Sequence, residues 1–266
     1  MPQLHIKNAP NVYLLFFLLA LSFFLSACSS FIGRAPERPP DPREIEARDL
    51  LDKIYKVNET LRTFKGIGRL NLSKRGTIRG GRVAWIGSYD GKLRIEVLGI
   101  SGQPIASLAS DGHWVYLSSQ VKRRFHKARI NDASLKNFIS IPVKTSDVIA
   151  LITGRVPVRE YSTAMVRKND TGDGYVLILK KRWGNVIEKI YMDNQKESVH
   201  KIEIFDVTGS LLYRVTLENI RIIQDYRIAM RLVMSNDTGA DFKLTIERYW
   251  PNIPVSTSMF ELVPPE

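Results

Sequence analysis

Cysteine is almost absent from this sequence of 266 residues, which contains a single one, Cys28. A lone thiol cannot form a disulfide within the chain. The presence of only one cysteine also excludes metal sites and redox pairs that are built from several cysteines. The thiol is therefore better suited to covalent attachment of another group than to cross-linking the fold.

Histidine is also scarce. Beyond the N-terminal segment the chain has only His113, His126 and His200, and none of them has a neighbour at the spacing of a metal site. The sequence contains no G-x-S-x-G nucleophile motif, no phosphate-binding glycine loop and no H-E-x-x-H zinc motif. We therefore expect no catalytic residue, no metal and no cofactor, and we expect that the protein is not an enzyme.

Long hydrophobic runs are limited to one, Val12 to Leu25, which is shorter than the roughly 20 residues that a membrane-spanning helix needs. A weakly basic start precedes the run, as in a secretory signal peptide. The run ends in Leu25-Ser26-Ala27-Cys28, which resembles the lipobox of bacterial lipoproteins. We predict a signal peptide over residues 1–27 and lipid attachment at Cys28. An ordinary signal peptide with a chance cysteine and an uncleaved anchor helix are the alternatives.

The residues after Cys28 are rich in proline and poor in apolar side chains, so residues 28–43 are predicted to be a lipidated tether. Stable anchoring takes more than one acyl chain, which a triacylated cysteine supplies. Ser29 stands where aspartate, in the lipoproteins that this segment resembles, favours retention in the inner membrane. We therefore expect a lipid-anchored protein of the outer membrane that faces the periplasm.

Basic residues exceed acidic ones, giving a net charge of +12 that falls to +11 when the predicted cleavage removes Lys7. The excess is spread over several short clusters between strand residues, which is typical of a solvated sheet face. The alternative is attraction to anionic lipid head groups or to an acidic partner protein. Nucleic acid is not an expected partner, because the signal peptide directs the chain away from it.

The domain predicted over residues 44–266 begins with a helical period. Apolar residues recur on one helical face from Arg43 to Phe64, with Asp41 as N-cap and Pro42 in the first turn. The period then changes to two, with turn residues between the segments. The expected strands are 69–73, 82–85, 92–97, 105–108, 114–117, 175–181, 186–192, 199–205, 211–217, 228–234 and 242–247.

Residues 131–154 interrupt the strands and are predicted to form two short helices, the second capped by Thr145 or Ser146 and ended by Gly154. About eleven strands with three helices provide too little helix to cover both faces of a sheet. The expected fold is mainly β: a single curved antiparallel sheet that forms a half-open barrel with an α-helical lid.

Two stretches of this sequence resemble the LolA/LolB family of periplasmic lipoprotein carriers and receptors, and within it the LolB-like outer-membrane lipoproteins. The first runs from Gly68-Arg69-Leu70-Asn71-Leu72 through Trp85 to the turn at 98–102. The second contains Ile141-Pro142-Val143 and ends in Gly154-Arg155-Val156-Pro157. The resemblance covers roughly residues 45 to 160 well and the C-terminal third only loosely.

The resemblance implies an apolar cavity for acyl chains such as palmitate and a protruding loop that inserts into the membrane. It places Ile100 or the nearby Leu98 in that loop. The side chains that it places along the cavity and under the lid are Leu70, Leu72, Val83, Trp85, Leu93, Ile95, Val97, Leu108, Leu151 and Ile152.

The function that the resemblance implies is uptake of acyl chains of lipoproteins from a periplasmic LolA-like carrier and their delivery to the outer membrane, by a monomer acting as a lipid-binding chaperone in protein transport. Two alternatives stay open. The same fold could serve as an envelope scaffold or sensor with a filled core and a protein partner, or it could carry another lipid.

Overall fold

The structure is a computed structural model that describes residues 41–74, 76–129 and 140–264. The signal peptide, Cys28, most of the tether and the first of the two predicted lid helices lie outside these residues. The described residues belong to one unit, Asp41–Glu266, whose first helix already includes residues 42 and 43. No helix among the described residues is long and apolar enough to cross a membrane.

The first helix, α2 (Pro42–Lys56), begins as predicted: the Asp41 carboxylate accepts a hydrogen bond of 2.9 Å from the backbone N–H of Arg43. The predicted extension to Phe64 is wrong. Asn58 has a left-handed backbone (φ 53°), and its side chain donates to the carbonyls of Thr153 and Arg227. These contacts with distant segments end the helix, so Phe64 falls in the first strand and is buried there.

Thirteen strands form one antiparallel sheet in the order β6-β5-β4-β3-β2-β1-β13-β12-β11-β10-β9-β8-β7. The strands are β1 (Thr63–Lys74), β2 (Thr77–Ser88), β3 (Lys92–Leu98), β4 (Pro104–Ser110), β5 (Trp114–Ser119), β6 (Arg124–Arg129), β7 (Thr163–Lys168), β8 (Tyr175–Lys180), β9 (Val186–Met192), β10 (Val199–Phe205), β11 (Leu211–Ile223), β12 (Tyr226–Ser235) and β13 (Ala240–Pro251). Every neighbouring pair is consecutive in sequence except β1 and β13, so the C-terminal strand joins the two halves of the sheet.

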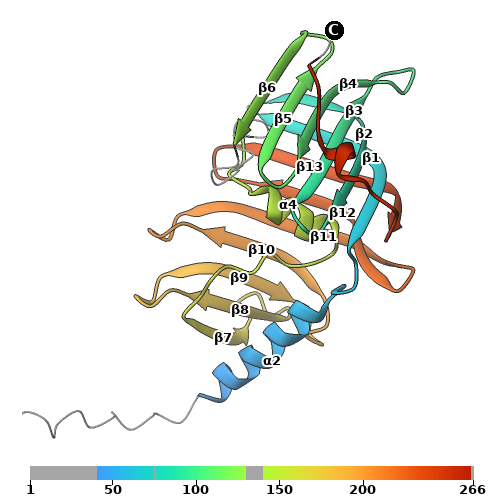
Figure 1. The fold of residues 1–266 in the computed structure, drawn as a ribbon. Coiled ribbons are helices and arrows are strands. Elements are labelled where there is room, and N and C mark those ends of the chain that lie inside the picture. The colour runs from blue at the N-terminus through green and yellow to red at the C-terminus, as the bar shows by residue number, and fades with distance from the viewer. Residues whose placement is uncertain (1–40, 75, 130–139, 265–266) are drawn as a thin grey trace, which may run out of the picture. The chain divides into compact units, whose positions relative to one another are not determined.

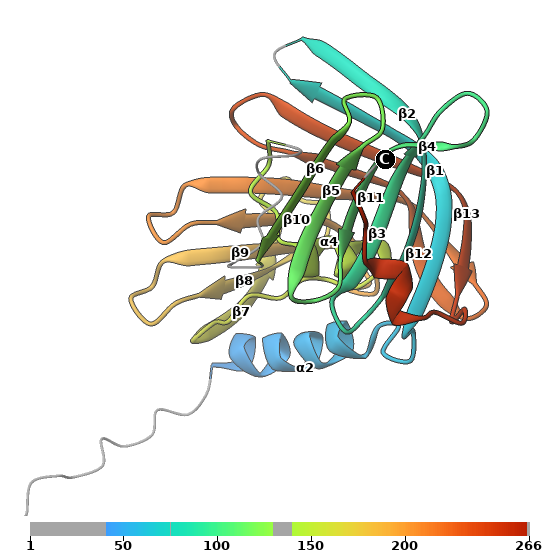
Figure 2. The same cartoon turned by 45° about the horizontal axis from the view of Figure 1, so that its top comes forward.

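The sheet curves without closing, because β6 and β7 form its two edges. Figures 1 and 2 show it curving around the short helix α4 (Thr145–Ile152), with α2 beside β7. The predicted fold class, a half-open barrel with a helical lid, is confirmed. The residues of 220–266 extend this sheet through β12 and β13, and the 3-10 helix η1 (Thr257–Phe260) then packs against β3.

The predicted strand set lacked β6 and β7, which are the two edge strands. The sequence of β6, Arg-Phe-His-Lys-Ala-Arg, has charged or polar residues on both faces, and most of its side chains are exposed. An edge strand pairs on one side only and often carries charge that blocks further pairing. Such a strand lacks the apolar alternation on which the prediction was based.

The concave face of the sheet is apolar because alternate residues of each strand point to the same side. Leu93 of β3 is fully buried, and Trp85 of β2 is almost so. Trp85 lies over Gly66 of β1, where a Cβ atom would collide with the indole ring. The glycine therefore allows a tryptophan to lie flat on the sheet at this point.

Candidate functional site

Two cross-strand rows of the concave face lead from the core toward the edge strand β6. One row pairs Trp85 with Ile95, Leu108, Leu117 and His126 in turn, each residue opposite the next on the neighbouring strand. The adjacent row runs through Val83, Val97, Ala106, Ser119 and Arg124 in the same way. Residues that are directly opposite each other share a face, so both rows line the inside of the curved sheet.

These rows form one wall of a pocket of about 390 Å³, which we call the α4 pocket. Val148 of α4 and Phe242 of β13 also line it. Its other lining residues are Leu70, Leu72, Ile95, Val97, Ala106, Ser107, Leu108, Leu117, Ser118, Ser119, Arg124 and His126. The lining is therefore apolar apart from three serines and two basic side chains, and no carboxylate belongs to it among the described residues.

The predicted cavity residues divide into two sets. Leu70, Leu72, Ile95, Val97 and Leu108 line the α4 pocket and are partly buried. Val83, Trp85, Leu93, Leu151 and Ile152 are at most 4% exposed and belong to the packed core. The alternation of a strand gives the face of each side chain, whereas its depth depends on what covers that face.

Helix α4 is the described part of the lid, and six of its eight residues are buried. Its N-cap is Lys144, not Thr145 or Ser146; both predicted caps lie inside the helix instead. The Asp147 carboxylate accepts a hydrogen bond of 3.2 Å from the Lys144 N–H, which satisfies the helix start from within. Gly154 follows the helix with φ 72°, as predicted, and a side chain there would collide with the Arg227 carbonyl.

A buried polar cluster holds α4 to the sheet. The Arg159 guanidinium donates to both oxygens of the Asp147 carboxylate, at 3.0 and 2.7 Å, and to the Tyr213 hydroxyl at 2.9 Å. The Tyr213 hydroxyl donates to Asp147 at 2.8 Å, and burial raises the pKa of this tyrosine. Asp147 is on the lid and Tyr213 is on β11, so the hydrogen bond between them links two elements that are distant in sequence, and the ion pair with Arg159 strengthens that contact.

Glu188 of β9 completes this cluster. It accepts a hydrogen bond of 2.7 Å from the Arg159 backbone N–H, and its residue is fully buried. Burial raises the pKa of Glu188 to about 8, and the hydrogen bond and the charge of Arg159 only partly oppose that shift. The carboxyl group is therefore neutral at pH 7.

Glu188 should make the folded state less stable as the pH rises. Its pKa is higher in the folded than in the unfolded chain, so between about pH 4.5 and pH 8 the free energy of unfolding falls by about 1.4 kcal/mol per pH unit through this group. A Glu188→Gln variant lacks this contribution, so it should gain stability relative to the parent chain from pH 5 to pH 8. Urea unfolding at both pH values measures the difference, and parallel profiles would contradict it.

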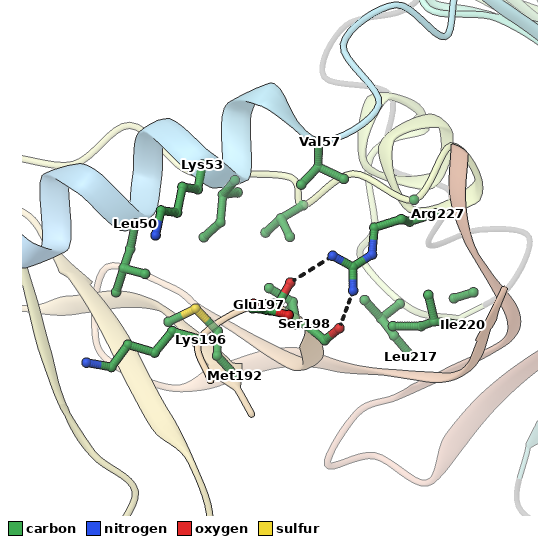
Figure 3. Close-up of a pocket in the computed structure, with 15 residues that line it drawn as sticks. Leu50, Lys53, Val57, Met192, Lys196, Glu197, Ser198, Leu217, Ile220 and Arg227 are labelled. Atoms are coloured by element: carbon green, nitrogen blue, oxygen red, sulfur yellow. Dashed lines mark hydrogen bonds between the residues drawn. The ribbon is translucent and has the colours of Figure 1, made fainter. Parts of the chain in front are cut away.

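A second pocket of about 360 Å³, the α2 pocket, lies between α2 and the sheet (Figure 3). Leu50, Ile54 and Val57 line its helix side, and Leu217 and Ile220 line its sheet side. The sequence predicted the apolar face of this helix but no pocket beneath it. Arg227 lies at this pocket and donates hydrogen bonds to the Ser198 hydroxyl at 2.7 Å and to the Glu197 carbonyl at 3.3 Å.

The two predicted loop residues have different environments. Ile100 is fully exposed in the turn between β3 and β4, which is held by a 2.8 Å hydrogen bond from Gly99 N–H to the Gln103 carbonyl. Leu98 is half-buried at the end of β3 and pairs with Arg82 on the convex side of the sheet. Only Ile100 is therefore placed to contact another surface.

The turn with Ile100 lies at the same end of the sheet as the α4 pocket. Leu98, at the end of β3, pairs with Pro104, the first residue of β4. Ala106 of β4 is two residues further along and already lines the pocket. The β5–β6 turn is at this end too and carries Lys122 and Arg123. The turns at the opposite end of these strands carry Asp90 and Asp111 instead.

The described residues contain no group of three or more histidine, cysteine, aspartate or glutamate side chains that could hold a metal ion. Of the three histidines, only His126 lines one of the two pockets described above. The candidate site, the α4 pocket, consists mainly of apolar side chains with two basic groups on one wall.

No protein-family model matches the sequence, and no curated protein matches it either. Solved structures do match the fold. A DUF1329 family protein from Desulfovibrio piger is similar with a TM-score of 0.61 and 9% identity over 82% of this chain and 97% of that one. A putative outer membrane lipoprotein-sorting protein domain from Vibrio parahaemolyticus has a TM-score of 0.53 and 13% identity, over 82% and 95% of the two chains.

A LolA superfamily protein from Nitrosomonas europaea matches with a TM-score of 0.52 and 13% identity, covering 81% of this chain and 97% of that one. At identities this low, the similarities are evidence for the fold alone, and they do not single out the receptor branch of the family. This chain has the curved-sheet fold of the LolA/LolB type.

Proposed function

We propose that this chain is a lipoprotein of the outer membrane that binds acyl chains in the α4 pocket and helps to localise lipoproteins. The apolar lining of that pocket carries the proposal. A volume of about 390 Å³ falls within the roughly 300–1,000 Å³ typical of ligand pockets. Each methylene group that leaves water gains about 0.8 kcal/mol, so an acyl chain binds there without covalent chemistry.

The anchor in this proposal is the lipidated Cys28, followed by Ser29 and a proline-rich tether. Such an anchor would keep the chain at the membrane that receives the cargo. The donor would be a periplasmic LolA-like carrier, and transfer would run toward the site with the higher affinity for the acyl chain.

A transfer assay tests the proposal directly. The mature chain, residues 28–266 with Cys28→Ser, would be mixed with a palmitoylated lipoprotein held by such a carrier, and cargo captured by each protein would be measured by pull-down. Movement of the cargo to this chain is the expected result. If the folded protein took up neither the lipoprotein nor free palmitate, the pocket would not be an acyl site, and the scaffold alternative would replace the proposal.

Ile100 should contribute to membrane contact. An isoleucine side chain that moves from water into lipid gains about 1.5–3 kcal/mol, and the basic residues of the β5–β6 turn add attraction to anionic lipid. We expect Ile100→Glu to lower binding to vesicles that contain phosphatidylglycerol by at least about tenfold. Vesicle co-flotation measures the effect.

Ile222 provides a matched control for this variant, since its side chain is 74% exposed on β11, close to the turn with Tyr226. That turn is at the opposite end of the sheet from Ile100, so Ile222→Glu should leave vesicle binding unchanged. Normal vesicle binding and lipoprotein delivery by Ile100→Glu would show that the loop does not insert.

A further inference from the structure

The two cross-strand rows of the α4 pocket both end in a basic residue. The row through Ile95, Leu108 and Leu117 ends at His126, and the adjacent row ends at Arg124. Both residues are on β6, the edge strand of the sheet, and both are exposed while lining the pocket. They are two positions apart on one face of the strand, which separates their Cα atoms by roughly 7 Å.

These two side chains are not used elsewhere in the described structure. Neither Arg124 nor His126 forms a side-chain hydrogen bond, an ion pair or a ring contact with any described residue. The basic residues on the other face of β6 differ in this respect. The Lys127 ammonium lies 4.6 Å from the Trp114 ring centroid, and the Arg129 guanidinium lies 5.4 Å from it.

The position of Arg124 and His126 at the end of the α4 pocket indicates the chemical class of ligand that the pocket would bind. An apolar pocket that ends in unpaired cationic or polar donors, with no carboxylate in its described lining, matches an amphiphile whose acyl chain ends in an anion. The chain would lie along the rows of leucine, isoleucine and valine, and the head would reach the rim at β6. A neutral head group would leave both side chains without a partner.

We propose that Arg124 and His126 form a head-group site that selects anionic amphiphiles, with a carboxylate or a phosphate at the end of the acyl chain. This inference rests on one part of the proposed function, the acyl chain held in the α4 pocket, and it extends the ligands from the ester- and amide-linked chains of lipoproteins to free anionic amphiphiles. It adds the ligand class: Arg124 supplies a fixed positive charge with several N–H donors, and His126 supplies a further ring N–H donor.

Two ligands with the same acyl chain separate this proposal from the proposed function. Palmitate carries a carboxylate, whereas monopalmitoylglycerol is neutral. The binding of each would be measured with the mature chain, residues 28–266 with Cys28→Ser, so that neither the apolar signal segment nor an acyl group on residue 28 can compete for the pocket. We expect palmitate, at a pH where it is ionised, to bind about tenfold more tightly than the neutral lipid.

Substitutions of Arg124 and His126 then test whether these residues cause the preference for palmitate. Arg124→Gln should lower palmitate affinity by about five- to tenfold, and the Arg124→Gln/His126→Gln double variant should remove the preference for palmitate. Both should lower the affinity for monopalmitoylglycerol much less than the affinity for palmitate, because the neutral lipid offers these side chains no charge. Lys127→Gln is the matched control, because it removes a charge from the opposite face of the same strand and should change neither affinity.

Each outcome has a distinct meaning. Equal binding of the two lipids, or an Arg124→Gln variant with normal palmitate affinity, would overturn the head-group site while leaving the acyl pocket in place. Binding of neither lipid by the folded chain would overturn both proposals. To distinguish a lipid head from a free anion, inorganic phosphate would be added as a competitor. Displacement of palmitate only at phosphate concentrations far above that of the lipid would support recognition of the whole amphiphile.

Discussion

Replacing Ile95 by asparagine should abolish measurable palmitate binding. Ile95 lies in the middle of the row that lines the α4 pocket, between Trp85 on β2 and Leu108 on β4. An amide group there would have to lose its water when an acyl chain arrives, and that desolvation costs roughly 2 kcal/mol or more. With the lost apolar contact added, we expect an affinity at least about one hundredfold lower, measured by displacement of a fluorescent fatty acid.

Ile86 provides the control for this substitution, because it is also half-buried but lies on the convex face of β2, one residue away from Trp85. Ile86→Asn should cost a similar amount of stability and leave palmitate affinity unchanged. If Ile95→Asn bound palmitate normally while remaining folded, the acyl chain would have to lie elsewhere. The α2 pocket, about 360 Å³ and mainly apolar, would then be the next candidate.

Removing the Asp147 carboxylate should destabilise the protein by about 3 kcal/mol. Asp147→Ala leaves the Arg159 guanidinium without its bidentate partner, and the arginine side chain is only 23% exposed. Removing one partner of a buried ion pair is destabilising, because the remaining charge stays desolvated and no longer has an opposite charge beside it. Urea unfolding gives the change in free energy directly.

The exposed pair of Arg167 and Asp170 is the control for this substitution, since its side chains are 46% and 76% exposed. Asp170→Ala should therefore cost less than about 1 kcal/mol. A double-mutant cycle with Asp147→Ala and Arg159→Met isolates the pair from the helix-capping role of Asp147. Additive effects would show that the two side chains are not coupled.

The same ion pair links stability to the proposed binding site. Asp147 and Val148 are consecutive residues of α4, the first on the polar cluster and the second on the α4 pocket. A lid that is no longer held to β11 would widen or close the pocket. We therefore expect Asp147→Ala to weaken palmitate binding as well, even at temperatures where the chain stays folded.

Apolar alternation along β1 to β5 was enough to predict the faces of the sheet. Ile95 and Val97 share a face with Leu93 because side chains alternate along a strand, and no tertiary information is needed for that. The start of α2 could be predicted in the same local way, because Asp41 and Pro42 act within one turn of the helix. Both inferences depend on contacts between near neighbours in the sequence.

Depth within the fold could not be predicted from that pattern. Val83 and Val97 are cross-strand partners, yet one is 1% exposed in the core and the other lines the pocket. Val83 belongs to a buried cluster that includes residues of α4 and β13, whereas Val97 is only partly buried against that cluster. Which residues are covered therefore depends on segments that are distant in the sequence.

The sequence by itself determined a lone cysteine after a short apolar run, a chain without recognisable catalytic motifs, and a curved β-sheet with one apolar face. Only the tertiary structure decided where α2 ends, that β6 and β7 are edge strands, and that Asp147, Arg159, Glu188 and Tyr213 form one buried cluster. The physical reason is range: alternation and capping act between neighbouring residues, whereas burial and ion pairing depend on segments that folding brings together.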